Sequence, residues 1–251
     1  MDIEYNWLAA LTAVGLVITT VTVGKILLFR LPALRNTREL DKEQNKLKWK
    51  NHGKKYHHRV KSSQMIGLGV TLGFYALVLP FVVTVDAQPW YRILLDSVLI
   101  LMMYDFFYYL THRFLFHGKG YFRRVHAVHH QARSRVSSID SYLLHPAEIV
   151  IGQALYYVAT PLLCLIYGEP LHVATIVITN VVFTQLNQIN HTRIDMEGLP
   201  WSIVNWIAMK HNAHHLDMHK GNFATITLLY DWLFGTVETH PRELEKSTSS
   251  T

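Results

Sequence analysis

The chain has 251 residues, of which 50% are hydrophobic and only 17% are charged, whereas an average soluble domain has roughly 25% charged residues. This balance excludes a disordered chain and a collagen-like or coiled-coil fibre. The single cysteine, Cys164, excludes an internal disulfide and a cysteine-rich metal site. The net charge of +6 suits either nucleic acid or an anionic membrane surface.

Five apolar runs are candidates for membrane spans, because a bilayer core requires about 20 residues of helix. In chain order they are residues 7–24, 65–85, 93–110, 149–167 and 171–190. Core helices of a soluble protein are the alternative, but five of them would leave too little polar surface. The sequence therefore predicts an all-α polytopic membrane protein with about four to five spanning or hairpin helices.

The charged residues orient these spans. Residues 30–61 contain 11 of the 24 lysines and arginines, and residues 113–135 contain six more. The N-terminus, MDIEYNW, is acidic and shows no cleavable signal, so we expect the first run to be retained. The positive-inside tendency then predicts that both basic stretches face the cytosol and that the N-terminus lies on the opposite side. The basic residues serve topology and lipid contact, so no nucleic-acid partner is expected.

Histidine is unusually frequent, with 16 residues. Nine of them follow the third and fifth apolar runs, which both end on the cytosolic side of the predicted topology. They are His112, His117, His126, His129, His130, His191, His211, His214 and His215. We therefore expect all nine in one cytosolic, histidine-rich cap.

The spacing of these histidines is typical of metal ligation. Helical residues turn by about 100° each, so the first and last histidines of H-x-x-H-H lie about 40° apart. This pattern occurs twice, at His126–His130 and His211–His215. His112 and His117 would lie about 140° apart on a straight helix and could not share an ion. Either they serve two metals, or the helix ends between them, near Gly118 and Gly120.

Nine imidazoles are too many for one ion, since zinc takes four ligands and a six-coordinate metal takes six. They suit two ions with four or five nitrogens each and room for an exogenous ligand. Imidazole alone does not choose between zinc, copper, iron and nickel. A centre beneath apolar helices suits a lipid substrate, and attack on an unactivated C–H bond requires iron and O2.

The ordered set of motifs resembles the fatty acid hydroxylase / sterol desaturase superfamily over roughly residues 95–237. The motifs are DFFYYLTHRFLFH, HAVHH, the His145-Pro146 element, Asn190-His191, HNAHH and YDWLFGT. The resemblance implies a membrane-bound enzyme with a non-haem di-iron site and O2 as co-substrate. It implies hydroxylation, desaturation or demethylation of a sterol, fatty acyl, sphingolipid or carotenoid substrate. Electrons would come from a separate cytochrome b5- or ferredoxin-type donor with its reductase.

The resemblance assigns all nine histidines as iron ligands and divides the chain into three parts. Residues 1–94 are expected to form N-terminal membrane helices and a basic cytosolic loop. Residues 95–237 are expected to form the catalytic domain, and residues 238–251 are expected to form a flexible tail. Four departures leave the substrate open: Asn187 where some relatives have histidine, Thr192 after His191, Phe223-Ala224 after Asn222, and Tyr230 before Asp231.

Supporting residues are predicted beside the ligands. Asp105 lies two helical turns before His112, where its carboxylate could accept a ring N–H, and Tyr109 lies between them. Asp231 and Glu148 are further candidates of this kind, and the resemblance places His145 near the site.

Two other classes of protein compete with the enzyme. A histidine-rich membrane metal transporter or metal-binding protein would need polar ligands along its spans, and a membrane cytochrome would need paired histidines inside them. The spans contain few such groups. The oligomeric state stays open.

Overall fold

The computed structural model describes residues 4–132, 137–192, 198, 199 and 201–241, and the chain in these ranges is mostly helical. The long helices are α1 (Trp7–Leu28), α2 (Pro32–Asn51), α3 (Lys54–Leu77), α4 (Trp90–Leu110), α6 (Pro146–Tyr167), α7 (Val173–Ile189) and α8 (Trp201–Leu216). The short elements are η1 (Leu79–Phe81), β1 (Val83–Thr84), η2 (Thr111–Phe116), α5 (Tyr121–His126), η3 (His129–Gln131), η4 (Ser138–Tyr142), β2 (Leu171–His172) and α9 (Leu229–Leu233).

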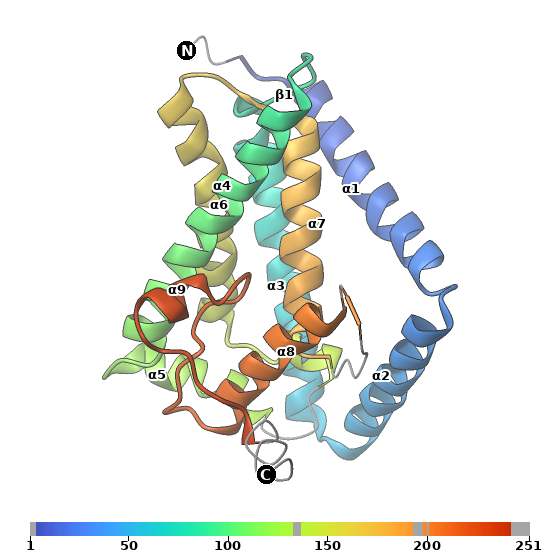
Figure 1. The fold of residues 1–251 in the computed structure, drawn as a ribbon, viewed down its shortest axis with the longest axis vertical. Coiled ribbons are helices and arrows are strands. Elements are labelled where there is room, and N and C mark those ends of the chain that lie inside the picture. The colour runs from blue at the N-terminus through green and yellow to red at the C-terminus, as the bar shows by residue number, and fades with distance from the viewer. Residues whose placement is uncertain (1–3, 133–136, 193–197, 200, 242–251) are drawn as a thin grey trace.

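Five helices run up and down through the long axis of the molecule. Helices α1, α4 and α7 descend from the end that carries the N-terminus, and α3 and α6 return to it (Figure 1). Four segments are long and apolar enough to cross a membrane, namely Trp7–Leu28, Lys54–Phe81, Trp90–Phe116 and Pro146–Tyr167. Val173–Ile189 is a shorter apolar helix. The predicted all-α polytopic membrane architecture is confirmed.

The bundle is held together by aromatic and small residues. Tyr156 stacks on Phe183 at a centroid distance of 4.3 Å, and Tyr104 meets Phe183 edge-on, which joins α6, α7 and α4. At the N-terminal end, β1 and β2 pair in parallel. Only Ala9, Ala10 and Ala13 of α1 are buried, so this helix packs closely against the bundle only in its first two turns.

Helix bounds differ from the sequence prediction at α3. The predicted run begins at residue 65, but the helix begins at Lys54, directly after Gly53. No proline or glycine interrupts residues 54–64, and lysine and arginine have high helix propensity, so the helix continues past its apolar part. The basic stretch at residues 30–61, expected to be a loop, is therefore formed mostly by α2 and the first turns of α3.

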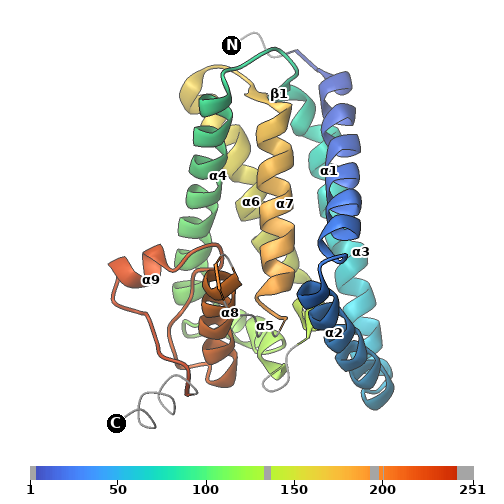
Figure 2. The same ribbon diagram turned by 45° about the vertical axis from the view of Figure 1, so that its right-hand side comes forward.

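Two long helices, α6 and α7, lie between His130 and His191, so the chain returns to the end of the bundle that it left. Figure 2 shows α5, α8 and α2 at the same end of the bundle, below α7 and opposite to the N-terminus. Helix α2 is attached there to η4 by polar contacts: Asp41 accepts from the Ser138 backbone at 2.8 Å, and Lys48 pairs with Asp140. Helix α2 thus holds η4 in place.

Candidate metal centre

The nine predicted histidines lie in two adjacent clusters, within each of which all the candidate ligand atoms are within 4.8 Å of one another. The five-histidine cluster is His112, His117, His126, His130 and His214. The four-histidine cluster is His129, His191, His211 and His215. All except His117 are buried. The structure therefore groups the nine imidazoles into one set of five and one set of four.

Each H-x-x-H-H motif contributes to both clusters. His126 and His130 belong to the five-histidine cluster, whereas His129 points to the other one. In α8 the two clusters exchange roles. His211 and His215 belong to the four-histidine cluster, and His214 belongs to the five-histidine cluster. Residues four apart share one face of a helix, so each motif gives a pair of histidines to one cluster and a single histidine to the other.

His112 and His117 share one cluster because the end of the α4 span is not a straight α-helix. Thr111–Phe116 form a π-helical turn, in which the His117 N–H donates to the His112 carbonyl at 2.9 Å. This i→i+5 bond brings residues five apart onto one side. Any side chain at position 118 would collide with the Phe114 carbonyl, 2.1 Å from a Cβ there, so the chain leaves this turn through glycine.

Most of the imidazoles donate their Nδ1–H to a fixed acceptor. His112 donates to the Phe223 carbonyl at 2.7 Å, His117 to Met218 at 2.8 Å, and His191 to Asn187 at 2.8 Å. His214 donates to the Gly221 carbonyl at 2.8 Å, and His126 to the Glu148 carboxylate at 2.6 Å. These acceptors fix the tautomer, so each Nε2 presents a lone pair.

Those lone pairs converge. The Nε2 atoms of His112, His126, His130 and His214 form a closed ring with edges of 3.0–3.1 Å. In the other cluster, consecutive Nε2 atoms lie 3.1–3.3 Å apart. Nitrogens bound to one ion at about 2.1 Å are separated by about 3.0–3.4 Å. Lone pairs at such distances repel unless a proton or a cation lies between them, and the separations in both clusters fit a divalent metal.

Burial keeps these imidazoles in the form that binds metal. It lowers the pKa of His117 to about 3 and that of His214 to about 4, and it lowers the pKa values of His129 and His211 as well. Neighbouring histidines lower the pKa of His117, His129 and His211 further. At neutral pH the rings are therefore uncharged, and protons compete weakly with a metal.

Asp105 does not contact a histidine, in contrast to the sequence expectation. Its buried carboxylate accepts from the backbone N–H groups of Thr225, Ile226 and Thr227 at 2.8–3.0 Å, and from the Thr227 hydroxyl. The side chain points across α4 to the loop at 222–228, a contact that sequence spacing along one helix could not reveal. Asp105 therefore supports His112 only through this loop.

Asp231 fixes the same loop from the other side. It accepts from the N–H groups of Phe223 and Ala224, both at 2.8 Å, and burial raises its pKa. Tyr109 meets no histidine; its hydroxyl contacts Thr236 at 3.2 Å. Asp231 and Tyr109 thus position the loop whose Phe223 carbonyl accepts from His112.

His145 lies outside both clusters, where its Nδ1 caps α6 by accepting from the Ala147 N–H at 3.2 Å. His172 lies at the opposite end of the bundle, where it caps α7. Among the carboxylates that the sequence suggested, Glu148 is the one that contacts an imidazole of the centre directly.

We expect the Glu148→Gln variant to bind metal about 10–100-fold more weakly, the usual cost of removing a carboxylate that orients a ligand. The amide can still accept from His126, but without the negative charge that makes this imidazole a stronger donor to metal. Competition with a chelator measures the affinity. Glu169→Gln, at the other end of the bundle, is the control. Equal affinity in the wild type and Glu148→Gln would contradict the role of the charge.

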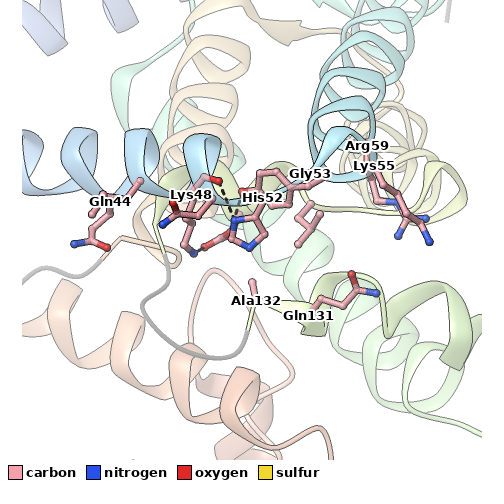
Figure 3. Close-up of a pocket in the computed structure, with 13 residues that line it drawn as sticks. Gln44, Lys48, His52, Gly53, Lys55, Arg59, Gln131 and Ala132 are labelled. Carbon is pink, nitrogen blue, oxygen red and sulfur yellow. Dashed lines mark hydrogen bonds and ion pairs between the residues drawn. The ribbon is translucent and has the colours of Figure 1, made fainter.

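Two cavities lie beside the centre. One, of about 460 Å³, is lined by His129, His191 and His211 and continues between α3, α6 and α7. The other, of about 570 Å³, lies between the end of α2, the start of α3 and the segment around Gln131 (Figure 3). None of the nine histidines lines this second cavity, and Figure 3 shows Lys55 and Arg59 side by side at its edge.

Fold and site together define a polytopic membrane protein with two buried histidine clusters suited to a pair of metal ions. Residues 97–236 match the family model described as fatty acid hydroxylase, which is more than half of the chain. The chain belongs to the fatty acid hydroxylase family, within the fatty acid hydroxylase / sterol desaturase superfamily that the motifs indicated.

Curated relatives differ in the reactions for which they are named. The chain is 29% identical to very-long-chain aldehyde decarbonylase GL1-8 of Oryza sativa subsp. indica, over 61% of this chain and 56% of that protein. It is 28% identical to methylsterol monooxygenase 2-2 of Arabidopsis thaliana (59% and 54%) and to C-4 methylsterol oxidase erg25 of Schizosaccharomyces pombe (61% and 50%). The chain thus matches about half the length of these relatives. No solved structure matches it.

Proposed function

We propose that this protein is a membrane-bound, O2-dependent di-iron oxidoreductase that hydroxylates or desaturates a C–H bond of a lipid. One observation carries the proposal: two histidine clusters suited to two metals lie side by side, and the four-histidine cluster lines a cavity that extends between apolar helices long enough to span a membrane. Relatives named as sterol oxidases and an aldehyde decarbonylase support lipid chemistry. When bound, the two irons would supply O2 activation and removal of hydrogen from carbon.

The protein's own residues would hold the irons, orient the rings, admit the lipid and exclude water. All nine histidines would hold the irons, and Glu148 and the carbonyls of Phe223 and Gly221 would orient three of the rings. The cavity would bring the lipid from the side of the spans to the four-histidine cluster. Burial of the centre excludes bulk water, which protects reactive intermediates from side reactions.

The electron donor is proposed to be a separate cytochrome b5- or ferredoxin-type protein with its reductase. We further propose that the histidine end of the bundle faces the cytosol, since residues 30–61 and 113–135 hold 17 of the 24 basic residues. A Lys119→Cys variant tests this orientation, because Lys119 is exposed at that end and the natural Cys164 is buried. An impermeant thiol reagent should label it only from the cytosolic side.

The function is tested with purified protein, ferrous iron, a reductase system, ¹⁸O2 and a lipid extract. Hydroxylation is expected to add one ¹⁸O atom to a lipid, and desaturation to remove two hydrogens. Both products should disappear when the reductase or the iron is left out. Binding of about two irons per chain without any lipid product would contradict the proposal.

A metal transporter is the alternative function. It requires ligands along a path through the membrane, but within the described ranges both groups of metal-binding residues lie at one end of the bundle. Tightly bound iron that does not exchange with added metal would agree with the enzyme, whereas rapid exchange would favour transport.

A further inference from the structure

The cavity beside the centre meets only one of the two clusters. His129, His191 and His211 line it, and all three belong to the four-histidine cluster, whereas no member of the five-histidine cluster does. From there the cavity follows α3 from Ser63 to Thr71, about 12 Å at 1.5 Å per residue. The four-histidine cluster therefore forms its inner end.

The cavity opens through the face of α3. Gln64 and Leu68 line it and are exposed to the surroundings of the bundle. Leu68 lies within a segment long and apolar enough to span a membrane, where it would face lipid. A volume of about 460 Å³ is in the range of ordinary small-molecule sites. A long lipid would place only its reacting part inside and leave the rest between α3 and the bilayer.

The lining is unusually polar for a lipid site, but most of its polar groups bond within the protein. Ser63 donates to the Leu144 carbonyl, Thr71 to Gly67 and Thr184 to Asn180. Gln188 donates to the Tyr142 hydroxyl at 3.1 Å. These groups therefore already have hydrogen-bond partners within the protein.

Gln153 differs from these groups. Its carbonyl oxygen is buried in the cavity wall and has no hydrogen-bond partner among the described residues. A buried acceptor without a donor costs roughly 1–3 kcal/mol, so such a group is expected to meet a ligand. Gln153 lies five residues after Glu148 on α6, about 7–8 Å further from the histidines along the helix. Glu148 also has one unpaired oxygen, but its other oxygen already binds His126.

We infer that Gln153 determines specificity by binding a hydroxyl group of the lipid, which places a nearby carbon of the same molecule at His129, His191 and His211. The inference rests on the proposed function and adds the substrate class to it. A hydroxyl is the group that fits, because it donates to the amide oxygen and can also accept from the amide nitrogen. A hydrocarbon, aldehyde or ketone has no donor for this oxygen.

The test is equilibrium binding to the purified, iron-loaded protein in nanodiscs. Two pairs of radiolabelled probes each differ by one hydroxyl: 5α-cholestan-3β-ol with 5α-cholestane, and 1-octadecanol with octadecane. The wild type should bind the alcohol of at least one pair about tenfold more tightly than its partner, which corresponds to about 1.4 kcal/mol. The pair that shows the preference identifies a ring or a linear lipid.

In Gln153→Leu the preference should fall below about twofold, because leucine keeps the bulk of the side chain but offers no acceptor. Gln64→Leu removes a glutamine at the rim of the same cavity and should keep the tenfold preference. Iron content near two per chain confirms that each variant is intact. Absence of a preference in the wild type, or a full preference in Gln153→Leu, would overturn the inference. Failure of the proposed function would instead appear as missing iron or missing lipid oxidation in the wild type.

Discussion

Replacing His215 by alanine is expected to reduce the metal content from two ions per chain to one and to lower lipid oxidation by at least about 100-fold. The four-histidine cluster has no spare nitrogen, and the Nε2 of His215 lies 3.1 Å from that of His211. Removal of a residue that merely orients a ligand already costs 10–100-fold, so removal of a ligand should cost more. Elemental analysis and product formation measure the two effects.

Two further variants complete this experiment. His130→Ala leaves four nitrogens in its cluster, so we expect it to retain more metal than His215→Ala. His219→Ala is the control, because His219 lies four residues after His215 but outside both clusters. If His215→Ala kept two ions and normal turnover, His215 could not be a ligand.

The gathering of the histidines at one end of the bundle was predictable, because it depends on the hydropathy of the spans and on their number. Apolar runs near 20 residues indicate spans, and an even number of spans between His130 and His191 returns the chain to the same side. The division of each H-x-x-H-H motif between two clusters follows from the same helical period, although the second motif is on α8 and the first is divided between α5 and η3.

The contacts that support the histidines could not be predicted in the same way. The π-helical turn at Thr111–Phe116 depends on tertiary packing, since its sequence also suits an α-helix. Three of the ring acceptors are the backbone carbonyls of Met218, Gly221 and Phe223, and any residue type has a carbonyl. The prediction that Asp105 orients a ligand was wrong because a carboxylate can be recognised in a sequence, whereas the direction in which its side chain points cannot.

These carbonyls make residues 217–225 as important to the centre as the motifs themselves. Asn222 adopts a left-handed backbone with a φ of 64°, and a Cβ at Gly221 would lie 1.8 Å from the Thr236 carbonyl. The chain must turn sharply here to present the carbonyls of Gly221 and Phe223 to two histidines of one cluster. Asp105 and Asp231 hold this turn by accepting its N–H groups.

For that reason, Asp105→Ala is expected to damage both stability and metal binding. Three backbone N–H groups would lose a buried acceptor at roughly 1–3 kcal/mol each, and because such losses are not additive we expect about 3–4 kcal/mol in total. The released loop would no longer fix the carbonyl that accepts from His112, so metal affinity should fall about 10–100-fold. Thermal unfolding and chelator competition measure these two losses.

Asp105→Asn should lose less stability and less metal affinity than Asp105→Ala, because an amide keeps one acceptor oxygen in the same place. Asp96→Asn is the matched control: Asp96 is also buried on α4, but it lies nine residues earlier, about 14 Å along the helix, beside Arg92. It should lower stability without changing metal affinity, since no histidine depends on it. If Asp105→Ala and Asp96→Asn weakened metal binding equally, the loss would reflect general destabilisation, and the loop would not be the link between α4 and the centre.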